Sequence, residues 1–126
     1  MKEEDLKKRT KQFALDTIKL VEGLPHDRTS HILGNQLLRA GTSVGANYRA
    51  ANRAKSSADF IAKMGTVEEE ADESAYWMEL LLDAGKLAAG EIEGLLQEAG
   101  ELTAIAVASV RTARRSAGRP RTVPTR

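Results

Sequence analysis

The chain of 126 residues is long enough for one domain with a buried core, and 41% of its residues are hydrophobic although only 4% are aromatic. It contains no cysteine, which excludes a disulfide framework, a cysteine-ligated metal and a thiol nucleophile. The first residues, MKEEDLKKRTKQ, lack an apolar run, and no stretch reaches the roughly 18 consecutive apolar residues of a membrane span. We therefore expect a cytoplasmic protein without a membrane partner.

The net charge of +1 conceals an uneven distribution of charge along the sequence. Five of the six residues from Glu68 to Glu73 are acidic, whereas the segment from Arg111 to Arg126 contains six arginines and no acidic residue. Blocks of one charge sign are typical of solvated faces and of interaction surfaces. Both segments are therefore candidates for a structural or functional role.

The first predicted helix covers about residues 3–23. Acidic residues in its first turn suit the positive end of the helix dipole, and Gly23 followed by Pro25 predicts its end. Apolar residues at helical spacing define its inner face, and two further residues are expected to widen that face. The inner face comprises Leu6, Phe13, Thr17, Leu20 and Leu24, widened by Leu15 and Ile18.

A second helix is expected to begin near Asp27 or Thr29, because either side chain can cap the free amides of the first turn. Gly34, Gly41 and Gly45 lie inside it, and each costs about 1 kcal/mol of helix propensity relative to alanine. Either a neighbouring backbone approaches where no side chain stands, or the helix is kinked between Gly41 and Gly45. The predicted buried side is Leu33, Leu37, Ala40, Val44, Tyr48 and Ala51.

A third helix is predicted from Ser56, which together with Asp59 resembles a capping box with Asp in place of the usual Glu, to about Asp83, with Gly85 as its stop. Its apolar residues follow one another at alternating steps of four and three, the spacing of a helix packed in a bundle. That stripe is Phe60, Met64, Val67, Ala71, Ser74, Met78 and Leu81. The second half is apolar over more than one face, with Trp77 on one flank and Leu82 on the other, so we expect self-association.

The fourth predicted helix spans about Ala89 to Ser116, and a flexible basic tail is expected over residues 118–126, where two prolines occur without apolar periodicity. Four amphipathic helices with short connections predict an all-α, antiparallel up-down four-helix bundle over residues 1–117. In the fourth predicted helix, the apolar residues at helical spacing are Ile92, Leu95, Leu96, Ala99, Leu102, Ile105, Ala106, Val110 and Ala113.

Two segments carry a family resemblance: RAGTSVGANYRAANRAKSSADFIAKMG, at 39–65, and EADESAYWMELL, at 70–81. They resemble the bacterial four-helix bundle proteins first met as products of intervening sequences in large-subunit ribosomal RNA genes and often labelled ribosomal proteins. The similarity covers about residues 13–115. It implies a small up-down bundle that assembles into a ring-like homo-oligomer, a pentamer.

A relative with the same fold is the accessory protein of diversity-generating retroelements. That relative is basic, binds nucleic acid and works with a reverse transcriptase. The resemblance therefore implies structured RNA or a nucleic-acid enzyme as a partner besides further copies of the chain. The present chain departs from that relative because it is nearly neutral and acidic in the middle of its third helix.

The acidic cluster at residues 68–73 has two interpretations. A di-iron bundle would need Glu-x-x-His pairs on facing helices, which this sequence lacks, so no metal site is predicted. Instead, like charges four residues apart repel each other, and cations from the second helix are expected nearby, either within the bundle or across a subunit interface. Asn47 is expected to fix the register between helices through a buried hydrogen bond. The predicted polar network comprises Arg39, Asn47, Arg49, Arg53, Glu69, Glu70 and Glu73.

The arginines near the end of the chain are the predicted nucleic-acid-binding residues. Arg111, Arg114 and Arg115 share one side of the last helical turns, where positive charge also complements the helix dipole; phosphate binding and this simpler role are both open. Trp77 is expected in the core or an interface, since base-stacking platforms usually combine several aromatics. The full predicted set is Arg111, Arg114, Arg115, Arg119, Arg121 and Arg126.

Motifs of catalysis are absent from the sequence, which has no glycine-rich phosphate loop, nucleophile elbow or zinc pattern. We therefore expect a non-enzymatic protein with no cofactor and no small-molecule substrate. Two hypotheses remain. The first is a nucleic-acid accessory protein that contacts RNA through phosphates, and the second is a protein-only scaffold that does not bind nucleic acid.

Overall fold

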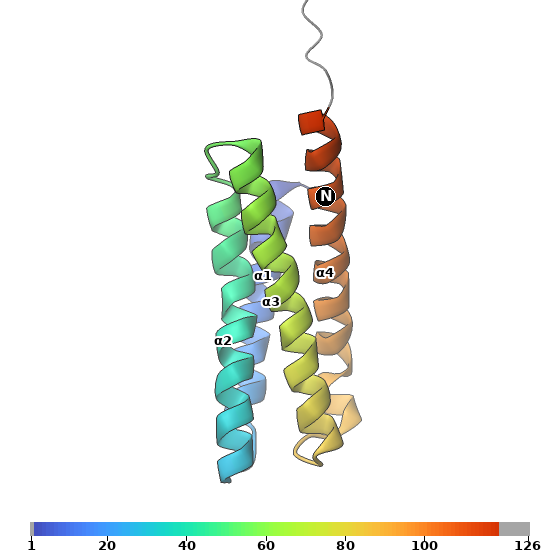
Figure 1. Cartoon of the computed structure of the whole chain (residues 1–126). Helices are drawn as coiled ribbons and strands as arrows, with labels where there is room; N and C mark the ends of the chain where they lie inside the picture. Colours follow the sequence, from blue (N-terminus) through green and yellow to red (C-terminus); the bar gives the residue numbers. More distant parts are fainter. Residues whose placement is uncertain (1, 119–126) are drawn as a thin grey trace, which may run out of the picture.

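The computed structural model describes residues 2–118, which form four helices and no strand (Figure 1). These helices are α1 (Glu3–Glu22), α2 (Arg28–Ala51), α3 (Ser57–Asp83) and α4 (Ala89–Gly118). Each helix packs against its neighbours in sequence, α4 also packs against α1, and successive helices run in opposite directions. The all-α prediction is confirmed, and α4 ends two residues later than predicted. No helix within the described range is both long and apolar enough to cross a lipid bilayer.

Local capping chemistry sets the helix boundaries. The Asp27 carboxylate accepts a hydrogen bond from the backbone N–H of Ser30 at 2.8 Å and begins α2. The hydroxyl oxygen of Ser56 accepts a hydrogen bond from the backbone N–H of Asp59 at 3.0 Å and begins α3. After α3, Gly85 adopts a φ of +75°, and the N–H of Lys86 bonds back to the carbonyl of Leu81 at 2.8 Å. This Schellman-type turn satisfies the last carbonyls of the helix and requires glycine at the positive φ.

The cap of α2 is also tied to the opposite loop. The ammonium group of Lys86, between α3 and α4, lies 3.2 Å from the second carboxylate oxygen of Asp27, between α1 and α2. The hydrogen bond from Ser30 and this ammonium group both lower the pKa of Asp27, and the bond from Ser30 contributes most. One carboxylate therefore begins a helix and joins two loops at the same end of the bundle.

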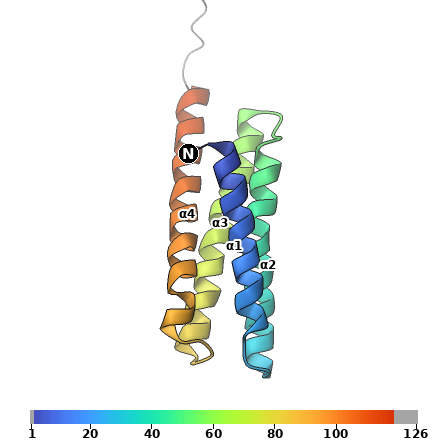
Figure 2. The same ribbon diagram turned by 180° about the vertical axis from the view of Figure 1, so that it is seen from behind.

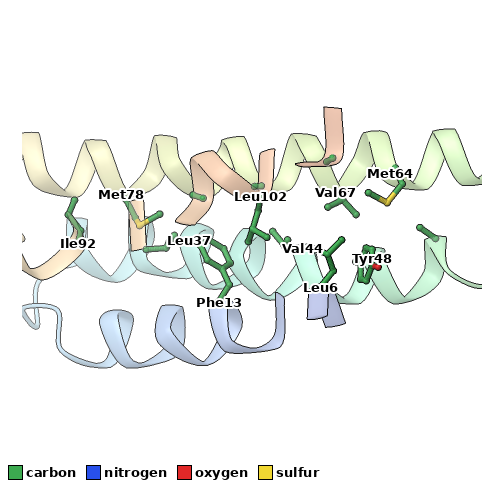
Figure 3. Close-up of a cluster of buried hydrophobic side chains, with 14 of the residues drawn as sticks. Leu6, Phe13, Leu37, Val44, Tyr48, Met64, Val67, Met78, Ile92 and Leu102 are labelled. Carbon is green, nitrogen blue, oxygen red and sulfur yellow. The ribbon is translucent and has the colours of Figure 1, made fainter. Parts of the chain in front are cut away.

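The core is a column of apolar side chains that runs along the bundle (Figure 3). Ile92 and Met78 lie toward one end, Phe13 is near the middle, and Met64 and Tyr48 lie toward the other end. Of the stripe predicted for α3, six residues are buried and Phe60 is partly buried. The predicted inner face of α1 was wrong at one position, because Leu15 is 48% exposed. Two residues, or about 200°, separate it from both Phe13 and Thr17, so it points away from them.

The glycines of α2 mark close helix approach rather than a kink. The helix is continuous from Arg28 to Ala51. A Cβ added at Gly41 would lie 2.7 Å from Cγ2 of Thr17, and one at Gly45 would lie 3.2 Å from Oγ1 of Thr10. Both threonines belong to α1 and are buried. The sequence left open a kink or the close approach of a neighbouring backbone. The structure shows close approach, but the atoms that fill the space at Gly41 belong to the Thr17 side chain, and those at Gly45 to the side chain and backbone of Thr10.

The interface between α1 and α4 is held differently. The guanidinium group of Arg9 donates to Glu98 from Nε at 2.9 Å and from a terminal nitrogen at 2.5 Å, and that nitrogen also lies 3.2 Å from Glu101. The hydrogen bond with Glu98 is the main cause that raises the pKa of Arg9. No pattern in the sequence singled out this pairing, since its partners are about ninety positions apart.

Candidate nucleic-acid interface

The arginines of α4 lie where the sequence predicted, on one side of its last turns. Arg111, Arg114 and Arg115 are all exposed. None of the three forms an ion pair with another residue in the range 2–118. In both views the end of α4 extends past the ends of the other helices (Figures 1 and 2). Arg119, Arg121 and Arg126 lie outside the described residues.

Charge is strongly sorted along the axis of the bundle. The end made of residues 2–11, 46–64 and 101–118 carries twelve lysines and arginines and five aspartates and glutamates. The remainder of the described chain, residues 12–45 and 65–100, carries four basic and thirteen acidic residues. We call the first region the basic end. A near-zero net charge therefore conceals a polar molecule that can attract a polyanion to one end.

Some charges at the basic end are already neutralised. Asp59 accepts a hydrogen bond from the ammonium group of Lys63 at 2.5 Å and one from the backbone N–H of Lys55 at 3.3 Å. These two contacts lower the pKa of Asp59, with Lys63 as the larger cause. Nearby, burial raises the pKa of Tyr48, whose hydroxyl donates to the carbonyl of Glu3 at 3.4 Å.

Part of the predicted polar network forms between α2 and α3. Arg39 lies 3.0 Å from a carboxylate oxygen of Glu70 and also forms an ion pair with Glu73. The indole N–H of Trp77 donates at 3.1 Å to Oε2 of Glu73, the oxygen that also pairs with Arg39. Trp77 is half-buried beside Tyr76, with ring centroids 5.1 Å apart. Its N–H is thus satisfied at the surface of the α2–α3 pair.

Other members of the predicted network lie elsewhere. In the antiparallel α2–α3 pair, Arg39 lies level with Glu70, so Arg49 lies about three turns away, near the start of α3. Arg53 is farther still, in the loop before α3. Glu69 is exposed and forms no ion pair with another described residue. Asn47 donates at 2.8 Å to the carbonyl of Ser43, within α2 rather than between helices.

The acidic residues of α3 do not converge. Glu69 and Asp72 are exposed, whereas Glu70 and Glu73 turn toward Arg39. Between residues 2 and 118, no group of three His, Asp or Glu side chains is arranged to hold a metal ion. The role that the geometry gives to this region is an ion-pair network between helices.

These observations define an antiparallel four-helix bundle with one basic end over the described residues. The model of the 23S rRNA-intervening sequence protein family matches residues 2–108, and the chain belongs to this family. Its structure is similar to the 1.70 Å crystal structure of an S23 ribosomal protein family member of unknown function from Bacteroides thetaiotaomicron. The TM-score is 0.78 and the sequence identity 31%, over 83% of this chain and 97% of that one. No curated protein matches the sequence.

Proposed function

We propose that the protein is a non-enzymatic, cytoplasmic accessory protein that binds structured RNA through phosphate contacts. The observation that carries this proposal is the trio Arg111, Arg114 and Arg115, exposed on one side of α4 and unpaired with any residue from 2 to 118. Guanidinium groups at adjacent helical positions suit phosphate oxygens, which they can contact in a bidentate manner.

The expected recognition follows the RNA backbone rather than its bases. The three arginines stand on a helix whose last two turns contain no aromatic residue that could stack on a base. Phosphate contacts fix position and carry no sequence information directly. Binding should therefore depend steeply on salt and differ little between RNAs of similar shape.

Self-association would multiply these contacts. The family resemblance implies a ring of five subunits, and α3 exposes apolar surface that a neighbouring copy could cover, including Tyr76 at 54% exposure. In a closed ring, each subunit would contribute its own set of arginines to one assembly. Linked sites raise the overall affinity without any new kind of contact.

The test is titration of a fluorescent structured RNA with the full chain and with Arg111→Gln/Arg115→Gln. The matched control is Lys19→Gln/Arg28→Gln, which removes two exposed cations far from the basic end. We expect the α4 variant to bind about tenfold more weakly than wild type. In a plot of log affinity against log salt concentration, its slope should be less negative by about 0.7 to 0.9 for each lost phosphate contact. Equal effects of the two variants would remove the α4 arginines from the interface.

A protein-only scaffold is the second candidate function. The observation in its favour is the outer surface of α3, where exposed Asp72 and Glu79 lie beside the exposed ring of Tyr76. Such a mixed acidic and apolar surface suits a basic protein partner, for example an enzyme that acts on nucleic acid. Failure of the full chain to bind RNA even at low salt would reject the first function and leave this one.

A further inference from the structure

A groove runs between α1 and α2, and its charged lining residues belong to the basic end. Figure 2 shows these two helices side by side. Lys7 and Lys11 approach the groove from α1, and Arg49 approaches it from α2. Short residues, including Gly45 and Ala46, complete its lining. The groove therefore combines open space with cations from both of its sides.

Helix packing explains why the groove exists. Gly45 allows α2 to approach α1 so closely that an added Cβ would lie 3.2 Å from Oγ1 of Thr10. This close approach brings cations of the two helices to a common space, while small side chains leave that space unfilled. The hydroxyl groups of Thr10 and Thr42 donate to carbonyls of their own helices at 2.8 and 2.7 Å. Charged groups are consequently the main hydrogen-bond donors available to a ligand.

The cations of this groove are largely uncompensated. Lys11 and Arg49 are exposed and form no ion pair with another described residue, and Lys7 makes only a 3.7 Å contact with the exposed Glu4. Lys7 and Arg49 also line an adjoining hollow, which adds Arg53 and one acidic residue, Glu3. The two hollows together form a cationic surface across the α1–α2 interface.

We propose that this groove binds a backbone phosphate of nucleic acid, at a site separate from the arginines of α4. This proposal rests on the proposed RNA-binding function and adds a second contact surface to it. Ammonium and guanidinium groups around a small-residue floor suit a compact anion, and the absence of aromatic residues from the lining argues against a stacked base. Both surfaces belong to the basic end, so one polyanion could contact them together.

The first test uses Lys11→Gln/Arg49→Gln in the full chain, with Lys19→Gln/Arg28→Gln as control. Each variant removes one lysine from α1 and one arginine from α2, all exposed, so the net charge changes equally. We expect the groove variant to bind structured RNA about tenfold more weakly than the control. The slope of its log affinity against log salt concentration should be less negative by about 0.7 to 0.9 for each lost phosphate contact. Equal affinities of the two variants would overturn the proposal.

A second variant separates a defined site from a diffuse positive field. Ala46→Leu keeps every charge and places a larger side chain in the groove, at a position exposed enough to accept it. A phosphate held in the groove would be displaced, so we expect weaker RNA binding with unchanged thermal stability and unchanged oligomer size by light scattering. Wild-type affinity for this variant would contradict binding in the groove. A changed oligomer size would instead identify the groove as a subunit contact and also overturn the proposal.

The outcomes distinguish this inference from the function on which it rests. If the wild-type chain binds no RNA at low salt, both proposals fail. If it binds, and only Arg111→Gln/Arg115→Gln weakens binding, the groove proposal fails alone. If only the groove variants weaken binding, the groove stands and the α4 arginines lose their role.

Discussion

The two interfaces of α1 use different physical means. Against α2, α1 is fitted by shape: Thr17 and Thr10 occupy the space that Gly41 and Gly45 leave open. Against α4, the Arg9 side chain of α1 forms ion pairs with glutamates. A hollow lined partly by charged residues, including Lys19 and Glu91, lies toward one end of this contact, and a mainly apolar hollow, including Leu6 and Ile105, lies toward the other. One helix is thus a close steric fit on one side and an ion-paired neighbour on the other.

This difference predicts which perturbations each interface tolerates. A close fit between small residues is sensitive to added volume and insensitive to salt, because dispersion and steric contacts are not screened. A partly exposed ion pair has the opposite sensitivities. The predictions that follow test this contrast in order of decreasing expected effect.

The largest effect is expected for Gly41→Val. The new Cβ alone would meet three atoms of Thr17 at 2.7 to 3.0 Å, and the two further carbons of valine add to the overlap. We expect the free energy of unfolding to fall by about 3 kcal/mol, measured by urea denaturation. The control is Gly65→Ala, in α3 with no neighbouring atom within 4 Å, which should stabilise by about 0.5 to 1 kcal/mol. A stabilising Gly41→Ala would show that α1 and α2 are not closely fitted.

A smaller effect is expected for Arg9→Leu. The change removes the ion pairs with Glu98 and Glu101. The side chains of Arg9 and Glu98 are about one quarter exposed, and that of Glu101 is about one half exposed. We expect a loss of about 1 kcal/mol at low salt. The difference from wild type should shrink near 1 M salt, where the screening length is only about 3 Å. A loss that is the same at both salt concentrations would indicate that the side chain acts through packing instead.

The smallest effect is expected for Asp27→Ala, beyond the ends of both interfaces. The folded state lowers the pKa of Asp27, so its stabilisation is complete above the unfolded value of about 4 and is lost as the pH falls through the folded value. The melting temperature of the variant should therefore lie below that of wild type at neutral pH. The two melting curves should converge on acidification. A difference in melting temperature between variant and wild type that stays constant from neutral to strongly acidic pH would contradict a role for the ionised carboxylate.

The helices and their inner stripes could be predicted because their signals are local. Gly23, Pro25, Ser56 and Gly85 each act within one or two turns of the boundary that they set. The role of Gly41 could not be settled, because it depends on which side chain of another helix lies opposite. Thr17 provides that answer, and it lies more than twenty positions away in the sequence.

The candidate site shows the same limit. The exposed arginines of α4 followed from charge and helical spacing alone. The sequence placed Arg49 near the acidic cluster of α3, either within the bundle or across a subunit interface. Within the bundle, the antiparallel register places it several turns away from that cluster. It lies instead beside Lys7 and Lys11, across an interface whose partners the sequence did not pair. Long-range register, rather than composition, decides where such a cation acts.

The position of Trp77 gives the molecule a built-in optical reporter. It is the only tryptophan in the chain, its N–H bonds to Glu73, and Tyr76 lies edge-on beside it. Unfolding would break that bond and hydrate the indole, which shifts its emission to longer wavelength. A neighbouring subunit that covers the same surface would shift the emission the other way. Fluorescence of the unlabelled protein would therefore distinguish unfolding from any subunit association on this surface by the opposite direction of the shift.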